Sequence, residues 1–147
     1  LAWSATCGAE RRGDFMKVRD VLAYVIGPYR DQRGAYFVAE NIRRAREVSL
    51  ALWNIGIPNI CPHANTALFD GAAPDEVWLA GDLVMLRRCD LAVTVPGWEK
   101  SSGSRAEVDD CESRGVHVFH AFYGSGRYYV PEQDILDCVR AREALRA

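Results

Sequence analysis

The sequence lacks the features that define several classes of protein. It contains no apolar run of about 18 residues, the minimum for a membrane-spanning helix. It has no basic excess, because the formal net charge is −2, so we expect neither a nucleic-acid nor a membrane partner. No internal repeat or low-complexity segment interrupts the chain. With 147 residues, 49% of them hydrophobic, the sequence predicts an ordinary globular protein with a single domain.

Cysteine is present but follows no pairing pattern. The five cysteines are odd in number and scattered, and none forms a C-x-x-C pair. This usage predicts free thiols in a reducing compartment, hence a cytoplasmic protein, rather than a disulfide framework or a zinc site. His63 and His117 have no partner at metal-ligand spacing, so we interpret both as structural. We expect no metal and no cofactor.

The first residues also lack the apolar core of a signal peptide. Met16 opens the more natural-looking stretch MKVRDVLAYVIGPYR. We therefore separate residues 1–15 from the fold, as an N-terminal extension or a remnant of cloning with no assigned role. The folded domain is expected at residues 16–147.

Beyond Met16, short apolar runs alternate with longer amphipathic segments. The apolar runs predict four strands, at residues 21–27, 57–63, 91–97 and 116–122. The amphipathic segments predict four helices, at residues 34–54, 74–89, 104–115 and 131–147, with a Gly/Tyr-rich loop at 123–129. This alternation predicts an α/β fold with a doubly wound, mostly parallel sheet of the flavodoxin or Rossmann type. Ligands bind such sheets at the carboxyl ends of the strands, so we expect the functional site there.

The stretch VPGWEKSSGSRAE, residues 95–107, allows two interpretations. Ser104 and Glu107 have the S-x-x-E spacing of a capping box, in which each side chain satisfies a free backbone N–H at a helix start. Alternatively, Glu107 projects into a pocket above the sheet and acts as a nucleophile. Residues 101–104 precede the predicted helix, so their hydroxyl and backbone N–H groups also form a candidate anion site.

Three other side chains have both a structural and a functional interpretation. Asp82 has apolar neighbours on its predicted helix, so its carboxylate either pairs with a backbone N–H or an arginine, or recognises a ligand with a raised pKa. Tyr24 is either a core residue or a pocket residue whose hydroxyl orients a carboxylate. Arg30 follows a Gly-Pro turn and is either solvated or placed to contact an anionic ligand group.

The order of these motifs resembles the nucleoside 2-deoxyribosyltransferase superfamily. The matching elements are Y-x-x-G in the first strand, GDLVMLRRCD before the third, and S-x-G-x-x-x-E after it, and the chain is most similar to a phage- and bacterial-type branch with GPYR, CPH and PGWE-x-S-x-G. The match covers about residues 22–120. It implies that Tyr24 hydrogen-bonds the catalytic carboxylate, that Asp82 recognises the base, and that Glu107 is the nucleophile. The expected substrate-binding residues are Gly27, Tyr29, Arg30, Ser101, Ser102 and Gly103.

One departure from the family pattern bears on the reaction. Where these transferases carry an aspartate near the sugar 5′-hydroxyl, this chain has Ser101, as in the related deoxynucleoside 5′-monophosphate N-glycosidases. The resemblance therefore implies deoxyribosyl transfer between bases, or else hydrolysis of a nucleoside 5′-monophosphate. Trp98 and Lys100 are explained by neither enzyme, so a non-catalytic nucleotide-binding module stays open. The PGG-x-GT motif of cytokinin-activating phosphoribohydrolases is absent. The resemblance also implies a homodimer or larger homo-oligomer whose pocket is completed by a neighbouring subunit.

Overall fold

Four short parallel strands form the centre of the computed structural model, which describes residues 17–147. The extension predicted at residues 1–15, Met16 and Cys7 lie outside the described residues. The elements in chain order are β1 (Ala23–Ile26), α2 (Ala35–Asn54), β2 (Asn59–Ile60), α3 (Pro62–Asn65), α4 (Asp75–Leu86), β3 (Leu91–Thr94), the short 3₁₀ helix η1 (Trp98–Lys100), α5 (Ser102–Ser113), β4 (His117–His120), β5 (Phe122–Gly124), β6 (Arg127–Tyr129) and α6 (Glu132–Arg146).

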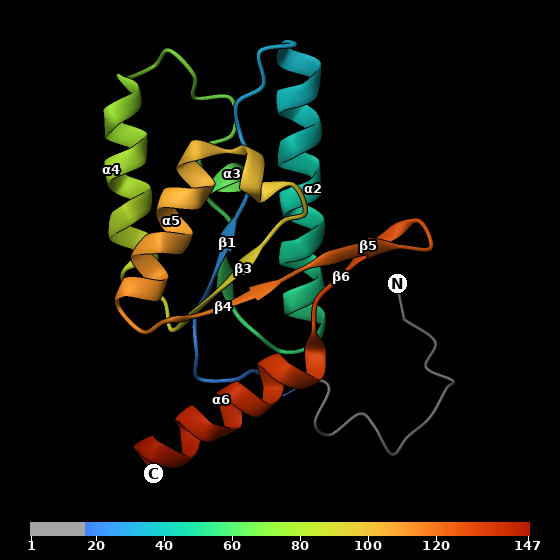
Figure 1. Ribbon diagram of the computed structural model, residues 1–147, viewed down its shortest axis with the longest axis vertical. Coiled ribbons are helices and arrows are strands. Elements are labelled where there is room, and N and C mark those ends of the chain that lie inside the picture. The colour runs from blue at the N-terminus through green and yellow to red at the C-terminus, as the bar shows by residue number, and fades with distance from the viewer. Residues whose placement is uncertain (1–16) are drawn as a thin grey trace, which may run out of the picture.

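The central sheet has the order β2-β1-β3-β4, and every pairing in it is parallel. Helices α4 and α5 lie on one side of the sheet and α2 on the other (Figure 1), and α6 joins the core on the α2 side. The predicted α/β fold with a doubly wound parallel sheet is therefore confirmed. Because the chain passes from β1 to β2 on one side and later to β3 on the other, the strand order switches between β1 and β3. This switch is where such folds open a binding crevice.

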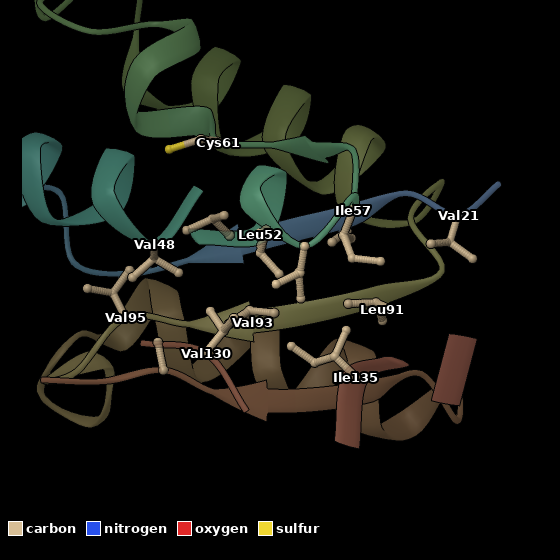
Figure 2. Packing of buried hydrophobic residues seen from close by; sticks show 14 of the residues in the cluster. Val21, Val48, Leu52, Ile57, Cys61, Leu91, Val93, Val95, Val130 and Ile135 are labelled. Atoms are coloured by element: carbon tan, nitrogen blue, oxygen red, sulfur yellow. The ribbon is translucent and has the colours of Figure 1, made fainter. Parts of the chain in front are cut away.

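Strand β1 divides its side chains between the two layers. Ala23 and Val25 join the core that α2 and α6 cover, which Figure 2 shows in part. Tyr24 and Ile26 point the opposite way, into the core beneath α4 and α5. Successive side chains of a strand alternate between faces, so this division fixes the direction of the Tyr24 phenol. The phenol lies on the same side of the sheet as Glu107 of α5.

Two predicted element boundaries are wrong. The strand predicted at residues 57–63 is limited to Asn59–Ile60, because Pro62 has no N–H to donate to a sheet and instead starts α3 with His63. The helix predicted from residue 104 begins at Ser102, with Ser101 as its N-cap.

The predicted Gly/Tyr-rich loop instead contains an antiparallel hairpin, β5–β6, in which Gly124 pairs with Arg127. The two connecting residues, Ser125 and Gly126, have φ values of 49° and 79°. Positive φ at both central positions is the geometry of the type I′ turn, one of the two common two-residue hairpin turns. A glycine and a short polar residue adopt that geometry, so the chain reverses here.

Candidate active site

A cleft of about 1070 Å³ opens at the carboxyl ends of β1 and β3. Its walls come from the turn after β1, from α3 and α4, and from the start of α5. The structure brings eight of the nine predicted site residues to this cleft: Gly27, Tyr29, Arg30, Asp82, Ser101, Ser102, Gly103 and Glu107. The ninth, Tyr24, is fully buried and reaches the cleft through its contact with Glu107.

Glu107 is held by a hydrogen bond to the central sheet. The Tyr24 hydroxyl donates to Glu107 Oε1 at 3.2 Å, joining residues of β1 and α5. The capping-box interpretation of Ser104 and Glu107 is wrong, because Ser101 is the N-cap and its Oγ accepts from the Ser104 N–H at 3.2 Å. Glu107 therefore lies in the second turn of α5, free of any capping role.

The surroundings of Glu107 favour its protonated form. Burial raises the pKa of Glu107 to about 8, and the negative charge of Asp82 adds to this rise, while the hydrogen bond from Tyr24 opposes it. Burial and the neighbouring Glu107 raise the pKa of Tyr24 far above its ordinary value. The phenol therefore stays protonated and acts as a hydrogen-bond donor to the carboxylate.

Asp82 supplies a second carboxyl to the same cleft. Burial raises the pKa of Asp82 to about 6. Within the part of the chain that the structure describes, its side chain has no hydrogen bond or salt bridge, so neither of the structural partners considered above, an arginine or a backbone N–H, holds it. Together with Glu107, it forms a carboxyl pair that holds one proton between about pH 6 and about pH 8. Such a pair has the composition that acid–base chemistry at neutral pH requires.

The turn after β1 is fixed by contacts that use several of its polar groups. Arg30 forms a salt bridge with Asp75 at the start of α4, so its guanidinium links two walls of the cleft. The Tyr29 hydroxyl donates to Asp70 at 2.8 Å and accepts from the Leu68 N–H at 3.2 Å. Both side chains line the cleft, and the Tyr29 hydroxyl and one nitrogen of the Arg30 guanidinium already have partners.

Gly27 and His63 hold this turn against the sheet. A Cβ at Gly27 would lie 2.8 Å from Val95 Cγ2, so only glycine fits the close approach. His63 Nε2 lies 2.9 Å from the carbonyl oxygen of Gly27 and 3.0 Å from that of Pro28, distances at which an Nε2–H would donate to them. Burial lowers the pKa of His63, which keeps the imidazole neutral. The structural interpretation of His63 agrees with these contacts, although the residue also lines the cleft.

The start of α5 presents polar groups to the cleft. The Ser101 Oγ accepts a hydrogen bond as the N-cap, which leaves its own O–H available for donation. Residues 102–104 form the first turn, whose backbone N–H groups create the positive end of the helix. Lys100 also lines the cleft, and within residues 17–147 its ammonium group has no salt-bridge partner. These groups together favour a negatively charged ligand group.

The sequence interpretation gave Trp78 no role in the cleft wall. Trp78 lies one helical turn before Asp82 and lines the cleft with it, and its ring contacts Phe69 with centroids 5.8 Å apart. Ser104, considered above both as a cap and as part of the anion site at residues 101–104, lines the cleft with a buried hydroxyl that has no hydrogen-bond partner in the described residues. The i, i+4 spacing of Trp78 and Asp82 could have indicated that Trp78 shares the cleft-facing side of the helix with Asp82.

Two residues that the resemblance left unexplained have structural contacts. Trp98 stacks on His120 with ring centroids 5.6 Å apart and an interplanar angle of 8°, beside a smaller hollow outside the cleft. Lys100 belongs to the cleft, as described above. His117, interpreted as structural, is exposed on β4, where its ring stacks on Phe119 at 6.1 Å.

Within the described residues, the structure shows neither a metal-binding cluster nor a membrane-spanning helix. Across residues 17–147, no group of three or more His, Cys, Asp and Glu side chains is arranged to hold a metal ion. The helices in this range are too short or too polar to cross a membrane. The cysteines in the same range are free thiols, at Cys61, Cys89, Cys111 and Cys138.

Comparison with known proteins assigns no family to this chain. No protein-family model matches the sequence, and no curated protein matches it at a significant level.

Proposed function

We propose that this protein cleaves the N-glycosidic bond of a nucleoside or nucleotide and transfers the deoxyribosyl group to another base. The observation that supports this proposal is the arrangement of Tyr24, Glu107 and Asp82. A buried carboxylate receives a hydrogen bond from a buried phenol, and a second carboxyl lies in the same cleft. This set supplies a nucleophile and an acid, as retaining glycosyl transfer requires.

In the first step, a Glu107 carboxylate oxygen attacks the anomeric carbon of the sugar. A carbon–oxygen bond to the enzyme forms while the bond from that carbon to the base nitrogen breaks, and the electron pair of the broken bond stays with the base. Asp82 gives its proton to the departing base. In the second step, an incoming base attacks the anomeric carbon, returns a proton to Asp82 and releases the Glu107 carboxylate.

Tyr24 has a positioning role in this scheme. Its hydroxyl holds one Glu107 oxygen at 3.2 Å and stabilises the ionised form. The reactive state has the proton on Asp82 and the charge on Glu107. The hydrogen bond from the phenol stabilises this state, although burial of Glu107 makes the state with the proton on Glu107 and the charge on Asp82 the more populated one.

The start of α5 favours a second candidate, hydrolysis of a nucleoside 5′-monophosphate. Lys100 and the first N–H groups of α5 suit a phosphate, and Ser101 adds an O–H without the repulsion that a carboxylate would exert there. A phosphate held at this position would direct the sugar toward Glu107. Water in place of the second base would then give the free base and a sugar phosphate.

A homodimer or larger homo-oligomer belongs to the same proposal. The resemblance implies that a neighbouring subunit completes the cleft, which the structure describes for a single chain. Light scattering at micromolar concentration tests this expectation, and a monomer would count against a shared pocket.

A base-release assay tests the proposed function. Deoxynucleosides, ribonucleosides and their 5′-monophosphates are incubated with the protein, with and without a second free base, and the products are separated by chromatography. Transfer predicts a new nucleoside only when the second base is present, and hydrolysis predicts release of base from the monophosphate alone. Glu107→Ala should lower either activity about 10³-fold. The control is Glu112→Gln, which removes an exposed carboxyl of the same helix and should leave the activity unchanged. Ligand binding without turnover by the unmodified protein would contradict the proposal.

A further inference from the structure

A second, smaller hollow opens where β3 and β4 end, separate from the cleft. Its volume is about 450 Å³, and the two cavities share no lining residue among residues 17–147. The turn after β3, which contains η1, forms one part of its wall, and the start of the β5–β6 hairpin, into which β4 leads directly (Figure 1), forms another. Its polar and aromatic lining residues are Thr94, Trp98, Glu99, His120, Phe122 and Tyr123. The proposed function gives this hollow no role.

Contacts within the chain fix the His120 and Trp98 rings at this hollow. Thr94, only 1% exposed, has its Oγ1 2.7 Å from Nδ1 of His120, a hydrogen-bond distance. The His120 ring stacks on the Trp98 indole, and the indole also packs against the core beneath α4 and α5. A ligand that contacts these rings therefore does not have to order them, which lowers the entropic cost of binding.

Phe122 and Tyr123 add two accessible rings to the hollow. They are 52% and 60% exposed, so much of each side chain remains open to a ligand. The hairpin supports both, because Phe122 stacks on Tyr129 with centroids 5.4 Å apart and Tyr123 packs on Tyr128 at 5.0 Å. A cation already uses this group of rings, since the guanidinium carbon of Arg127 lies 4.6 Å from the centroid of the Tyr129 ring. The aromatic part of the hollow is thus suited to a second positive group.

Glu99 gives the hollow a negative charge. Among the residues that line it, all within the described range, there is no lysine or arginine. The Glu99 carboxylate has no hydrogen bond or salt bridge in residues 17–147. The Arg105 guanidinium donates to the main-chain carbonyl oxygen of Glu99 at 2.6 Å, and Arg105 is not a lining residue. An unpaired carboxylate beside aromatic rings attracts a cation and repels a phosphate or a carboxylate.

We propose that this hollow binds a small organic cation that carries a quaternary or methylated ammonium group. Methyl groups spread the positive charge over an apolar surface, which packs on aromatic rings, and the carboxylate balances that charge. A divalent metal ion fits less well, because it requires several oxygen ligands and Glu99 supplies one carboxylate. The contacts are few and partly exposed, so the affinity is weak, with a dissociation constant in the millimolar range. This site is independent of the proposed function, since its residues take no part in the cleft.

Proton NMR titration of the full chain with tetramethylammonium tests this site. The ring currents of the aromatic residues should move the methyl resonance of the ligand upfield, along a single saturable curve. Choline should behave in the same way. Its uncharged carbon isostere, 3,3-dimethyl-1-butanol, should bind at least about fivefold more weakly, because it lacks the charge that the rings and Glu99 attract. Absence of saturation, or equal binding of choline and its isostere, would overturn the proposal.

Substitutions at exposed positions assign the binding to the hollow without disturbing the core. Tyr123→Leu removes one ring and Glu99→Gln removes the carboxylate, and each should raise the dissociation constant about threefold or more. Trp53→Leu is the matched control, because it removes a 50% exposed ring of α2 outside the hollow and should leave binding unchanged. Far-ultraviolet circular dichroism checks that each variant is folded. Unchanged binding in either of the first two variants, or an equal loss in Trp53→Leu, would refute the proposal. Since the readout is ligand binding, failure here leaves the base-release result unaffected.

Discussion

Replacing Glu107 with glutamine should change how the stability of the protein depends on pH. Burial raises the pKa of Glu107 from its ordinary value of 4.5 to about 8, so the folded state binds a proton that the unfolded chain has already lost. A folded-state pKa above the unfolded value gives stability at low pH that is lost as pH rises through the folded pKa. Glutamine is uncharged at every pH and still accepts a hydrogen bond from Tyr24. The stability of the Glu107→Gln variant should therefore not fall in this way as the pH rises.

The magnitude follows from the size of the change in pKa. Each pH unit between 4.5 and about 8 lowers the free energy of unfolding of the unmodified protein by up to about 1.4 kcal/mol. Over the whole interval the advantage of Glu107→Gln grows from near zero to an upper limit of about 5 kcal/mol. Such a difference is comparable to the total stability of a small domain. It should be readily measured.

Urea unfolding under reducing conditions, from about pH 5 to about pH 9, measures this difference by tryptophan fluorescence. The comparison is between the unmodified protein, Glu107→Gln and the control Glu112→Gln. The advantage of Glu107→Gln should increase with pH, whereas the control should follow the unmodified protein. If the difference between Glu107→Gln and the unmodified protein is constant across this range, the assignment of a buried, proton-binding Glu107 is refuted.

Three further predictions concern activity. The pH dependence of kcat/KM should be bell-shaped with limbs near 6 and 8, because the reactive form holds one proton on the Glu107–Asp82 pair; a flat profile over this range would contradict the assigned roles. Tyr24→Phe should lower kcat/KM about tenfold and move the limb near pH 8 upward, since the lost hydrogen bond had lowered the pKa of Glu107; an unshifted profile would remove Tyr24 from the positioning role. Ser101→Asp should selectively reduce cleavage of a 5′-monophosphate through like-charge repulsion, and equal effects on nucleoside and monophosphate would exclude a phosphate at this end of the cleft.

The periodicity of the sequence was sufficient to predict the fold but not the ends of its elements. Apolar runs bounded by glycine and proline locate β1 and β3, since buried parallel strands are apolar on both faces. The start of α5 could not be read in the same way, because Ser101 and Ser104 are both acceptable caps. The path of the chain through η1 decides between them, and this path depends on tertiary contacts.

The candidate site, like the fold, could be predicted from the sequence only in part. The resemblance places Tyr24 and Glu107 in related roles, and the structure joins their side chains. Two other features could not be predicted from local sequence patterns. The salt bridge of Arg30 to Asp75 spans 45 residues, and no local pattern reveals it. Helix α4 is apolar around most of its circumference, so periodicity alone could not show which side faces the cleft and which is exposed.

The central claim, that Glu107 is the nucleophile, is tested most directly by trapping the covalent intermediate. A deoxynucleoside with fluorine at the 2′ carbon forms the glycosyl-enzyme and releases it slowly, because the fluorine destabilises both oxocarbenium-like transition states. Intact-protein mass spectrometry should show one added sugar per chain, and peptide mapping should place it on Glu107. Glu107→Gln should acquire no adduct. A sugar on another residue, or turnover of natural substrate by Glu107→Ala, would contradict the account.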